Sequence, residues 1–491
     1  MKFWQTFLGI LMLTLCGACQ HGLSGTYEQV GAKPVLFPDY TDITIPYNIA
    51  PLNFIMDSAD RVSIIILGDN EYRFSFSSGR VTFPLKKWKA ILKAEMGNRL
   101  EVYVKTREGR QSRAYRPFIW HVAQEPIDAY MSYRRIEPAY EVWNKLQICE
   151  RDVTTFKERT LADNNITDNT CINCHTSNKA PRPATFMHVR GKKGGTVYAK
   201  DGQLKKVNTA TNRTSGAAVY GELDQSGRYG IFTTATIIPI LHSFRTQRLE
   251  VYDTQSDLIL LDFERGTVSD TPCITGSAFQ ETFPCFSADN RTIYFCRANS
   301  LPQPDSTFHM RYNLYSIGFD PATGTLADSV TCVLDLAALG KSAAFPKCSP
   351  DGKFLLFCAS DYGTFPIWHA ETDLWMLNLA TGELNTLERT NGLYADSYHS
   401  WSSNGRWIAF ASKRGDRVYG RPYLAYVNAS GDTEKAFVLP LKDPNAYRTT
   451  LQSYNIPELY PTRETYGAGR IRTNYFRQDV DAFVYKPAVN E

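Results

Sequence analysis

The chain has 491 residues, of which 43% are hydrophobic and 21% are charged. A chain this long and this apolar exceeds a single hydrophobic core and excludes a disordered protein, so we expect two folded domains. The formal net charge is +4, from 54 basic and 50 acidic residues. Because the basic residues form no long run, the sequence has no electrostatic footprint for nucleic acid, and we expect protein or small-molecule partners.

The N-terminus carries the features of a signal peptide. Met1-Lys2 precedes an apolar run from Phe7 to Leu15, which is too short to span a bilayer but has the length of a signal-peptide core. The small residues before Cys19 resemble the lipobox of bacterial lipoproteins, although Cys16 stands where that motif has an aliphatic residue. The resemblance implies a signal peptide over residues 1–19 and a lipid on Cys19. Cleavage without lipidation is the alternative.

The residues after Cys19 bear on location. Gln20 is not the aspartate that marks inner-membrane retention in lipoprotein sorting patterns, and residues 20–30 lack the acidic cluster of some surface-exported lipoproteins. The resemblance to these patterns implies an outer-membrane lipoprotein of the cell envelope whose body faces the periplasm. No later apolar run is long enough to cross a membrane.

Residues 34–125 are expected to form a small β-rich domain with one helix. Residues 62–67 and 72–76 alternate between apolar and polar side chains and flank Gly68-Asp69-Asn70, which predicts a hairpin. Residues 84–96 follow with helical spacing and a glycine stop at Gly97, and three apolar side chains share one helix face: Trp88, Ile91 and Leu92.

The second domain, residues 126–490, contains an internal repeat. Four segments align without gaps, at residues 221–232, 284–295, 346–357 and 399–410. Each has an apolar stretch, a polar centre of the Ser-Pro-Asp-Gly type and a second apolar stretch such as Leu355-Leu356-Phe357. Proline and glycine supply turn geometry, so each segment predicts strand, tight turn and strand.

These repeats resemble the TolB-type, WD40-like propeller repeat, and residues 374–382 are similar to its outer hairpin. The resemblance implies an all-β fold in which a β-propeller follows the small N-terminal domain. The repeats are spaced more widely than a minimal blade of about 40 to 45 residues, so the loops between strands must be long. Four copies do not close a ring. We expect residues 140–160 and 168–195 to add one or two blades, and we expect a ring of five to seven blades in total.

The motif that carries chemistry is Cys171-Ile172-Asn173-Cys174-His175. Covalent attachment of haem needs two thiols that add to its vinyl groups and a histidine directly after them that binds the iron. The motif therefore predicts one covalent haem c on Cys171 and Cys174, with His175 as the proximal iron ligand. Export supports the prediction, because c-type haem is attached outside the cytoplasm.

Three other interpretations of this motif compete with haem. A zinc knuckle would need a second Cys or His pair at metal-ligand spacing, and none follows closely. A thioredoxin-like dithiol would need a βαβ context, whereas Cys171 follows the polar stretch 163–170. A structural disulfide would not need His175. Haem is the favoured interpretation.

The haem-binding segment, residues 168–195, also carries a family resemblance. From Cys171 to Gly195 the chain resembles the haem-bearing segment of exported TolB-like proteins of Bacteroidetes. The resemblance extends over residues 38–54, residues 133–152 and the repeats, so it covers most of the chain. It implies functional roles for Cys171, Cys174 and His175 only.

Two neighbouring residues, Met187 and His188, are candidates for the sixth iron ligand. We expect a loop stiffened by prolines to bring them over the haem, and in an extended stretch only one of the pair can face the iron. His188 is favoured, because imidazole is the commonest metal ligand and Met187 follows Phe186 as a core residue would. Arg182 or Arg190 could pair with the haem propionates.

The mature chain holds seven further cysteines, Cys149, Cys273, Cys285, Cys296, Cys332, Cys348 and Cys358. Cys296 and Cys358 follow a strand phenylalanine at the same repeat position, so we expect both to be packing residues. A disulfide between Cys273 and Cys285 is open, since pairing cannot be deduced from the sequence.

Three functions follow from these features. The favoured one is a lipid-anchored, monohaem c-type cytochrome-like propeller for electron transfer or redox sensing in the cell envelope. The second is a scaffold for envelope proteins in which the haem is structural, and the third is a peroxidase-like haem enzyme. Gly-x-Ser-x-Gly, His-Glu-x-x-His and Walker A motifs are absent, which disfavours a hydrolase and leaves enzymatic activity open. Expected partners are envelope redox or assembly proteins.

Overall fold

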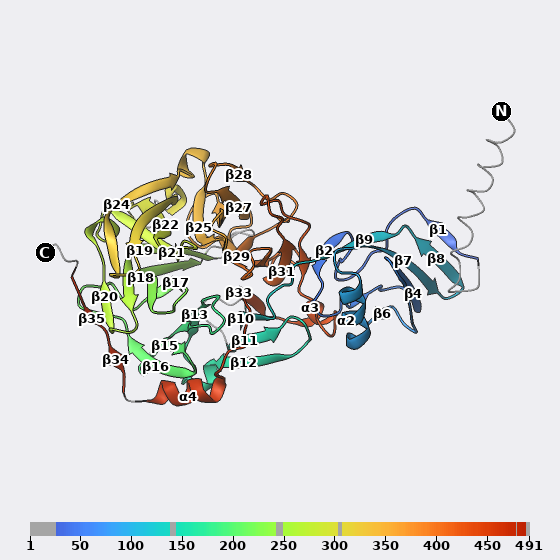
Figure 1. The fold of residues 1–491 in the computed structure, drawn as a ribbon, viewed down its shortest axis with the longest axis horizontal. Helices are drawn as coiled ribbons and strands as arrows, with labels where there is room; N and C mark the ends of the chain where they lie inside the picture. Colours follow the sequence, from blue (N-terminus) through green and yellow to red (C-terminus); the bar gives the residue numbers. More distant parts are fainter. Residues whose placement is uncertain (1–25, 138–143, 242–248, 303–306, 478, 488–491) are drawn as a thin grey trace. The chain divides into compact units, whose positions relative to one another are not determined.

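The computed structural model describes residues 26–137, 144–241, 249–302, 307–477 and 479–487 (Figure 1). The chain forms two compact units. The first comprises the described residues up to Gln124 together with Pro440–Arg448, a segment that the sequence analysis placed in the second domain. The second comprises Glu125–Leu439 and the residues from Thr449 onward. The predicted signal peptide and Cys19 lie outside the described residues.

The first unit is a mixed sheet with one helix. Its strands are β1 (Glu28–Val30), β2 (Ile43–Pro46), β4 (Arg61–Leu67), β5 (Glu71–Phe76), β7 (Arg99–Glu108), β8 (Gln111–Tyr115) and β9 (Phe118–Ala123), beside a separate pair, β3 (Phe54–Ile55) and β6 (Arg80–Val81). The predicted hairpin is confirmed as β4 and β5, and the predicted helix as α2 (Leu85–Ala94). Trp88 on the buried face of α2 packs edge-on against Trp120 of β9, with ring centroids 5.6 Å apart.

The second unit is a six-bladed β-propeller, which confirms the predicted all-β fold. Blade 1 contains β10 (Tyr130–Ile136), β11 (Leu146–Asp152), β12 (Glu158–Asp163) and β33 (Ser453–Tyr460). Blade 2 contains β13 (Ile172–Ser177), β14 (Thr185–Val189), β15 (Gly195–Lys200) and β16 (Gln203–Asn208). Blade 3 contains β17 (Val219–Leu223), β18 (Tyr229–Leu241), β19 (Leu249–Asp262) and β20 (Thr267–Ser269).

The remaining three blades follow in chain order. Blade 4 contains β21 (Phe279–Phe286), β22 (Thr292–Asn299), β23 (Asn313–Asp320) and β24 (Thr325–Leu334). Blade 5 contains β25 (Ser342–Cys348), β26 (Phe354–Ser360), β27 (Asp373–Asn378) and β28 (Leu384–Asn385). Blade 6 contains β29 (Asp396–Trp401), β30 (Trp407–Ser412), β31 (Arg421–Tyr426) and β32 (Phe437–Val438). The four sequence repeats are the first two strands of blades 3 to 6.

Two strands from distant parts of the chain close the ring. In blade 1, β10 pairs antiparallel with β33, from Tyr130 opposite Tyr460 to Ile136 opposite Ser453. The C-terminal strands β34 (Asp481–Ala482) and β35 (Val484–Tyr485) then add a parallel fifth strand to blades 2 and 3. The short helices are α3 (Ala446–Thr449), α4 (Ala468–Phe476), η1 (Asn164–Ile166), η2 (Pro272–Ile274), η3 (Thr307–His309), η4 (Ala337–Leu339) and η5 (Pro366–Trp368). Within the described residues, helices that are both long and apolar enough to cross a membrane are absent.

In blades 4 to 6 the serine of the repeat stabilises its turn through two hydrogen bonds. In blade 5 the hydroxyl of Ser349 accepts from the backbone N–H of Phe354 at 3.0 Å and donates to Asp351 at 2.7 Å. Ser287 and Ser402 make the equivalent pair of bonds in blades 4 and 6. The polar centre of the repeat is therefore a side-chain network that fixes the turn between two buried strands.

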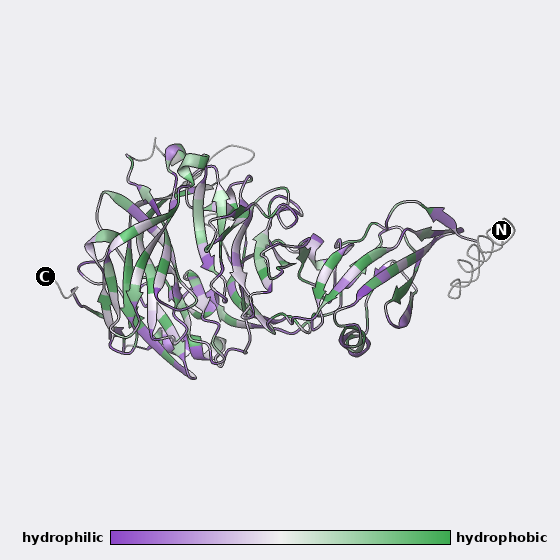
Figure 2. Ribbon diagram, turned by 45° about the horizontal axis from the view of Figure 1, so that its top comes forward, coloured by the Kyte–Doolittle hydropathy of each residue, from purple (hydrophilic) through white to green (hydrophobic). Residues whose placement is uncertain are grey.

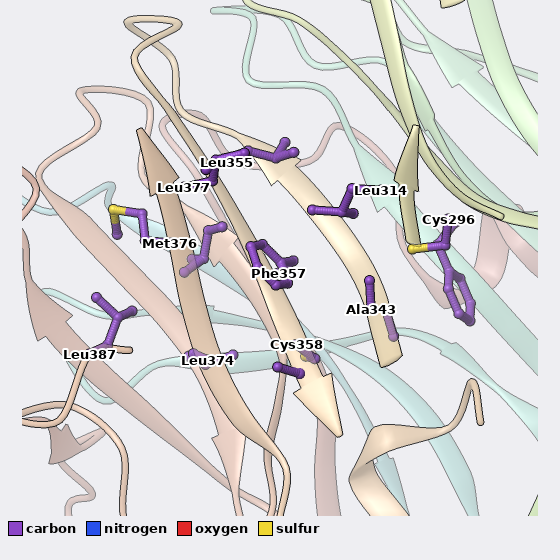
Figure 3. Packing of buried hydrophobic residues seen from close by; sticks show 14 of the residues in the cluster. Cys296, Leu314, Ala343, Leu355, Phe357, Cys358, Leu374, Met376, Leu377 and Leu387 are labelled. Atoms are coloured by element: carbon purple, nitrogen blue, oxygen red, sulfur yellow. The ribbon is translucent and has the colours of Figure 1, made fainter. Parts of the chain in front are cut away.

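Hydrophobic residues recur along the strands of the propeller (Figure 2), and the buried ones form clusters that join neighbouring blades. Between blades 4 and 6, Leu355 and Phe357 of β26 lie in one cluster with Cys296 and Cys358 (Figure 3). Both cysteines are fully buried, which confirms the predicted packing role. Burial raises the pKa of the Cys358 thiol to about 12, so the thiol stays protonated. All nine described cysteines are free thiols, Cys273 and Cys285 among them.

Replacing Ser349 by alanine should destabilise the propeller by about 1 kcal/mol, because the substitution removes two hydrogen bonds from a buried turn. Urea unfolding of the variant beside the wild type measures this difference. Ser329→Ala is the matched control, since Ser329 is exposed on β24, and it should change the free energy of unfolding by less than about 0.5 kcal/mol. Equal effects of the two substitutions would contradict the role of the turn network.

Candidate functional site

The Cys-x-x-Cys-His motif lies on the inner strand of blade 2. Cys174 and His175 belong to β13, and Met187 and His188 belong to its neighbour β14. The segment that the sequence analysis expected as a loop is therefore a hairpin of two blade strands, with only the turn between them proline-rich. The alternation of residues 185–189 between the two faces of the blade explains the difference, since it satisfies both interblade cores at once.

Cys174 is one of six equivalent residues that line the central channel. Each inner strand carries a β-bulge at which one residue has a positive φ, between 41° and 54°: Cys174, Tyr220, Phe283, Phe345, Tyr398 and Ile456. We call these six residues the channel ring. All six line one cavity, whose free volume is about 60 Å³. A bulge re-aims the side chain at that position, and here six bulges direct six side chains to the propeller axis.

The two motif cysteines lie in different surroundings. Cys174 is 8% exposed in the channel ring, and burial raises the pKa of its thiol to about 11. Cys171, just before β13, is half-buried and packs against the apolar cluster between blades 1 and 2. Cys171 is close enough for its charge to contribute to the raised pKa of Cys174. The Cys174 thiol is therefore protonated near neutral pH.

His175 is a buried imidazole whose ring nitrogens are not satisfied. It is 3% exposed, and neither nitrogen makes a hydrogen bond of ordinary geometry within the described part of the chain, although the Ile456 backbone lies nearby. Burial, together with the positive charge of Arg134, lowers the pKa of His175 to about 3. The ring is therefore neutral, which is the form that binds a metal.

His399 occupies the equivalent position of blade 6 and serves as an internal comparison. Both histidines directly follow a channel-ring residue, Cys174 in one blade and Tyr398 in the other. His399 Nε2 donates to the backbone oxygen of Leu356 at 3.0 Å, and its Nδ1 lies 3.6 Å from the Cys358 sulfur. The same backbone position thus holds one satisfied histidine and one unsatisfied histidine. His175 is the one that stands in the motif.

The two candidates for the sixth ligand face opposite sides of blade 2. Met187 is 1% exposed and packs in the apolar cluster between blades 1 and 2. Phe186 faces blade 3, where it stacks on Phe232 with ring centroids 4.1 Å apart, and alternation places His188 on that same side. Burial, followed by the charge of Arg190, lowers the pKa of His188 to about 4, and its Nδ1 lacks a described hydrogen-bond partner.

One end of the channel carries a mixed cluster of charges. Lys347 lies 3.5 Å from Glu222, and Glu458 accepts from the backbone N–H of Ser177 at 2.9 Å. Burial raises the pKa of Glu458, and the neighbouring lysines Lys347 and Lys179 oppose that rise. These opposite charges largely compensate one another, so the cluster provides a polar lining without a strong net charge.

The other end of the channel is closed by the segment between β26 and β27, which contains η5. Phe365 packs edge-on against Tyr220 with ring centroids 5.9 Å apart. Ile367 lies in one cluster with Tyr398, and Phe345 packs against that cluster. Ile456 packs against the same cluster, so four residues of the channel ring surround this segment, which we call the η5 plug (residues 361–372).

A buried charge bridge holds the η5 plug to the β18–β19 hairpin. His369 is 1% exposed, its Nε2 lies 3.2 Å from Glu250 and its Nδ1 lies 3.2 Å from Glu371. Burial disfavours the charged ring, but the two carboxylates outweigh burial and raise the pKa of His369 to about 9. The hydroxyl of Thr364 also donates to the Val251 backbone oxygen at 3.3 Å. The imidazolium is therefore the form present at neutral pH.

The thiols and the imidazole of the motif are the groups that a c-type haem needs, but the channel beside them is too small to hold a haem. Two thiols and a neutral imidazole with unsatisfied nitrogens are the groups that covalent haem attachment requires. The channel holds about 60 Å³, room for about two water molecules, while ligand pockets measure about 300 to 1,000 Å³. A haem on these residues requires a different packing around β13.

Comparison with family models and with curated proteins finds no match. Among solved structures, a puromycin-hydrolysing peptidase of Mycobacterium tuberculosis is similar at 11% identity over 70% of this chain, with a TM-score of 0.33. This chain covers 52% of that peptidase, about half its length. The periplasmic gluconolactonase PpgL of Pseudomonas aeruginosa is similar at 14% identity over 63% of this chain and 96% of its own, with a TM-score of 0.35. These similarities indicate nothing about activity.

Sequence reasoning missed the channel ring and the bridge at His369. An aromatic residue directly before the repeat segment in blades 3 to 6 was a usable signal for the ring: Tyr220, Phe283, Phe345 and Tyr398. The bridge left no such signal, because Glu250 and His369 are far apart in the chain and only the folded propeller brings them together.

Replacing His369 by glutamine should destabilise the protein most at neutral pH and below. The folded-state pKa of His369 is raised from 6.5 to about 9, so its stabilising charge is fully present below pH 6.5 and is lost as the pH rises through 9. At neutral pH the loss should be about 3 to 5 kcal/mol, since the buried carboxylate of Glu250 loses the positive charge of His369. Thermal unfolding at a series of pH values measures the difference, which should shrink between pH 6.5 and 9.

His309→Gln is the control for this experiment, because His309 is exposed. It should cause only a small change in the unfolding temperature. A difference between wild type and His369→Gln that stays constant over the same pH range would show that His369 carries no charge in the bridge.

Proposed function

We propose that the protein is an exported, lipid-anchored TolB-like propeller that carries one covalent haem c and transfers electrons or senses redox state in the cell envelope. The single observation that carries this proposal is the contrast between the two equivalent histidines. His399 has partners for its ring, whereas His175, directly after Cys174, is buried, neutral and unsatisfied. An unsatisfied buried imidazole is costly unless another group completes it.

In this proposal Cys171 and Cys174 form the two thioether links and His175 binds the iron. The bound haem would supply a centre that gains and loses one electron. Arg190 is the favoured partner for a propionate, because its charge already acts on both Cys174 and His188. The proposal also requires that side chains around β13 move apart in the haem-loaded protein, since the channel is closed here.

Expression in a periplasm that attaches c-type haem tests the cofactor directly. The wild type should stain for covalent haem on a denaturing gel, and the double variant Cys171→Ser, Cys174→Ser should not, because both thioether links are lost. Cys332→Ser is the matched control, since Cys332 is an exposed free thiol, and it should stain like the wild type. Absence of covalent haem from the wild type, or staining of the double variant, would overturn the proposal.

Visible spectra of the loaded protein test the axial ligands. His175→Ala should convert a low-spin spectrum to high spin, because it removes the proximal ligand. We expect His188→Ala to alter the sixth ligand as well, whereas Met187→Ala should leave the spectrum unchanged and cost about 2 to 5 kcal/mol of stability as a core truncation. A far-red band in the oxidised protein that is lost only in Met187→Ala would assign the sixth ligand to the methionine instead.

A second candidate function is a scaffold for envelope proteins in which the haem is only structural. The observation that favours it is that β10 and β33 close six blades around a channel already filled by side chains. The double cysteine variant separates the two functions. If the variant keeps wild-type stability and loses electron exchange with a small redox protein, the electron-transfer function is upheld. If it instead loses stability together with the assembly of envelope proteins, the scaffold function is upheld.

The lipid anchor and the location belong to the same proposal. Cys19→Ala should abolish incorporation of labelled palmitate and release the protein from the outer-membrane fraction. A variant that remains membrane-bound would show that another feature retains the protein.

A further inference from the structure

A groove on the outer part of blade 3 has the size of a ligand site and is separate from the central channel. Its free volume is about 780 Å³, within the range of about 300 to 1,000 Å³ that small-molecule sites occupy. Blade 3 forms one wall with β19, β20 and the C-terminal strand β35, and the β23–β24 turn of blade 4 forms the other. The residues proposed to hold the haem do not line this groove.

The lining of the groove is rich in hydroxyl and carboxylate groups. Eight threonine and serine residues contribute, namely Thr214, Thr234, Thr267, Ser269, Thr271, Thr275, Thr323 and Thr325. Asp257, 8% exposed, accepts from the Gly276 backbone N–H at 2.8 Å and from Gln255 at 3.3 Å. A carboxylate offers about four acceptor positions, so Asp257 retains capacity for further donors. Asp270 accepts from the hydroxyl of Tyr485 at 2.9 Å.

Tyr229 provides an independent indication of a ligand. Its side chain is 3% exposed, it lines the groove, and its buried hydroxyl makes no hydrogen bond within the described residues. The hydroxyl lies beside Gly324 of the opposite wall, where a Cβ would approach it to 2.7 Å. A glycine at this position leaves the hydroxyl room, and a buried hydroxyl without a partner costs free energy unless a ligand or water completes it.

The charged residues of the groove limit the kinds of ligand that it can bind. Four aspartates line it, Asp257, Asp262, Asp270 and Asp328, against three basic residues, Arg213, Arg265 and Lys486. Asp262 is occupied by Arg228, whose guanidinium lies 2.8 Å away. The other three aspartates are matched by the three basic residues, so the groove favours neither an anion nor a cation, and its many hydroxyls make an apolar ligand unfavourable. A molecule with many hydroxyl groups can donate to the carboxylates and accept from the hydroxyls and Gln255.

We propose that this groove binds a short, uncharged oligosaccharide. The hydroxyl groups of the sugar would donate hydrogen bonds to Asp257 and Asp270 and would form hydrogen bonds with the threonine side chains. One sugar hydroxyl would form a hydrogen bond with the hydroxyl of Tyr229. Bound sugar would lie between blade 3 and blade 4, away from the η5 plug and the channel ring. The site is therefore independent of the haem.

Calorimetric titration of the purified full chain tests this inference. The probes are the tetrasaccharides maltotetraose, cellotetraose, xylotetraose, mannotetraose and chitotetraose, each at up to about 10 mM, which detects a Kd of about 1 mM. At least one should bind. A tetrasaccharide of galacturonic acid should bind more weakly, because its carboxylates would lose hydration in a groove whose charges balance. Absence of binding by all five neutral probes, or preference for the acidic one, would overturn the proposal.

Variants locate the binding in the groove. Asp328→Trp places a bulky ring in the groove from an exposed position on β24 and should weaken binding at least about tenfold. Ser329→Trp is the matched control, since Ser329 is the exposed neighbour that does not line the groove, and it should bind like the wild type. Tyr229→Phe should weaken binding about two- to tenfold through the loss of one hydrogen bond. Unchanged binding in Asp328→Trp would place the sugar elsewhere and overturn the proposal.

Discussion

The pairing of β10 with β33 is the constraint on which the propeller depends. Tyr130 pairs with Tyr460 across most of the chain, so the ring closes only when the last blade strand reaches the first. The same strand β33 provides Ile456 of the channel ring and Glu458 of the charged cluster, and its backbone lies beside His175. The environment that leaves His175 buried and neutral is therefore built by the closure itself.

Equivalent positions in different blades carry different chemistry. The bulge repeats six times with nearly the same φ, which shows that the backbone of the channel is set by the fold and not by any one side chain. The residue after the bulge is proline or glycine in four blades, a satisfied histidine in blade 6 and an unsatisfied histidine in blade 2. Comparison of the six blades thus identifies His175 as the residue at this position that differs from its equivalents.

Features carried by neighbouring residues could be predicted from the sequence, and features that join distant residues could not. The Ser349 turn, helix α2 and the buried Cys296 and Cys358 each follow from a short stretch of chain. Cys171, Cys174 and His175 could be recognised as a motif for the same reason, because they lie within five consecutive residues. The loop expected between His175 and His188 is instead part of the β13–β14 hairpin, because its partner surfaces, the two interblade cores, come from residues far along the chain. The bridge from Glu250 to His369 and the groove around Asp257 require the assembled propeller.

The β18–β19 hairpin has a consequence for how the propeller unfolds. It begins in blade 3, contacts Tyr312 of blade 4 through Asp253, and contacts His369 of blade 5 through Glu250. Proteins built from repeats are commonly described by the stability of each repeat and the coupling between adjacent repeats alone. The contact between the β18–β19 hairpin of blade 3 and His369 of blade 5 adds coupling between two blades that are not adjacent. The three blades should therefore melt as one cooperative block, and fraying from one blade to the next should stop at its edges.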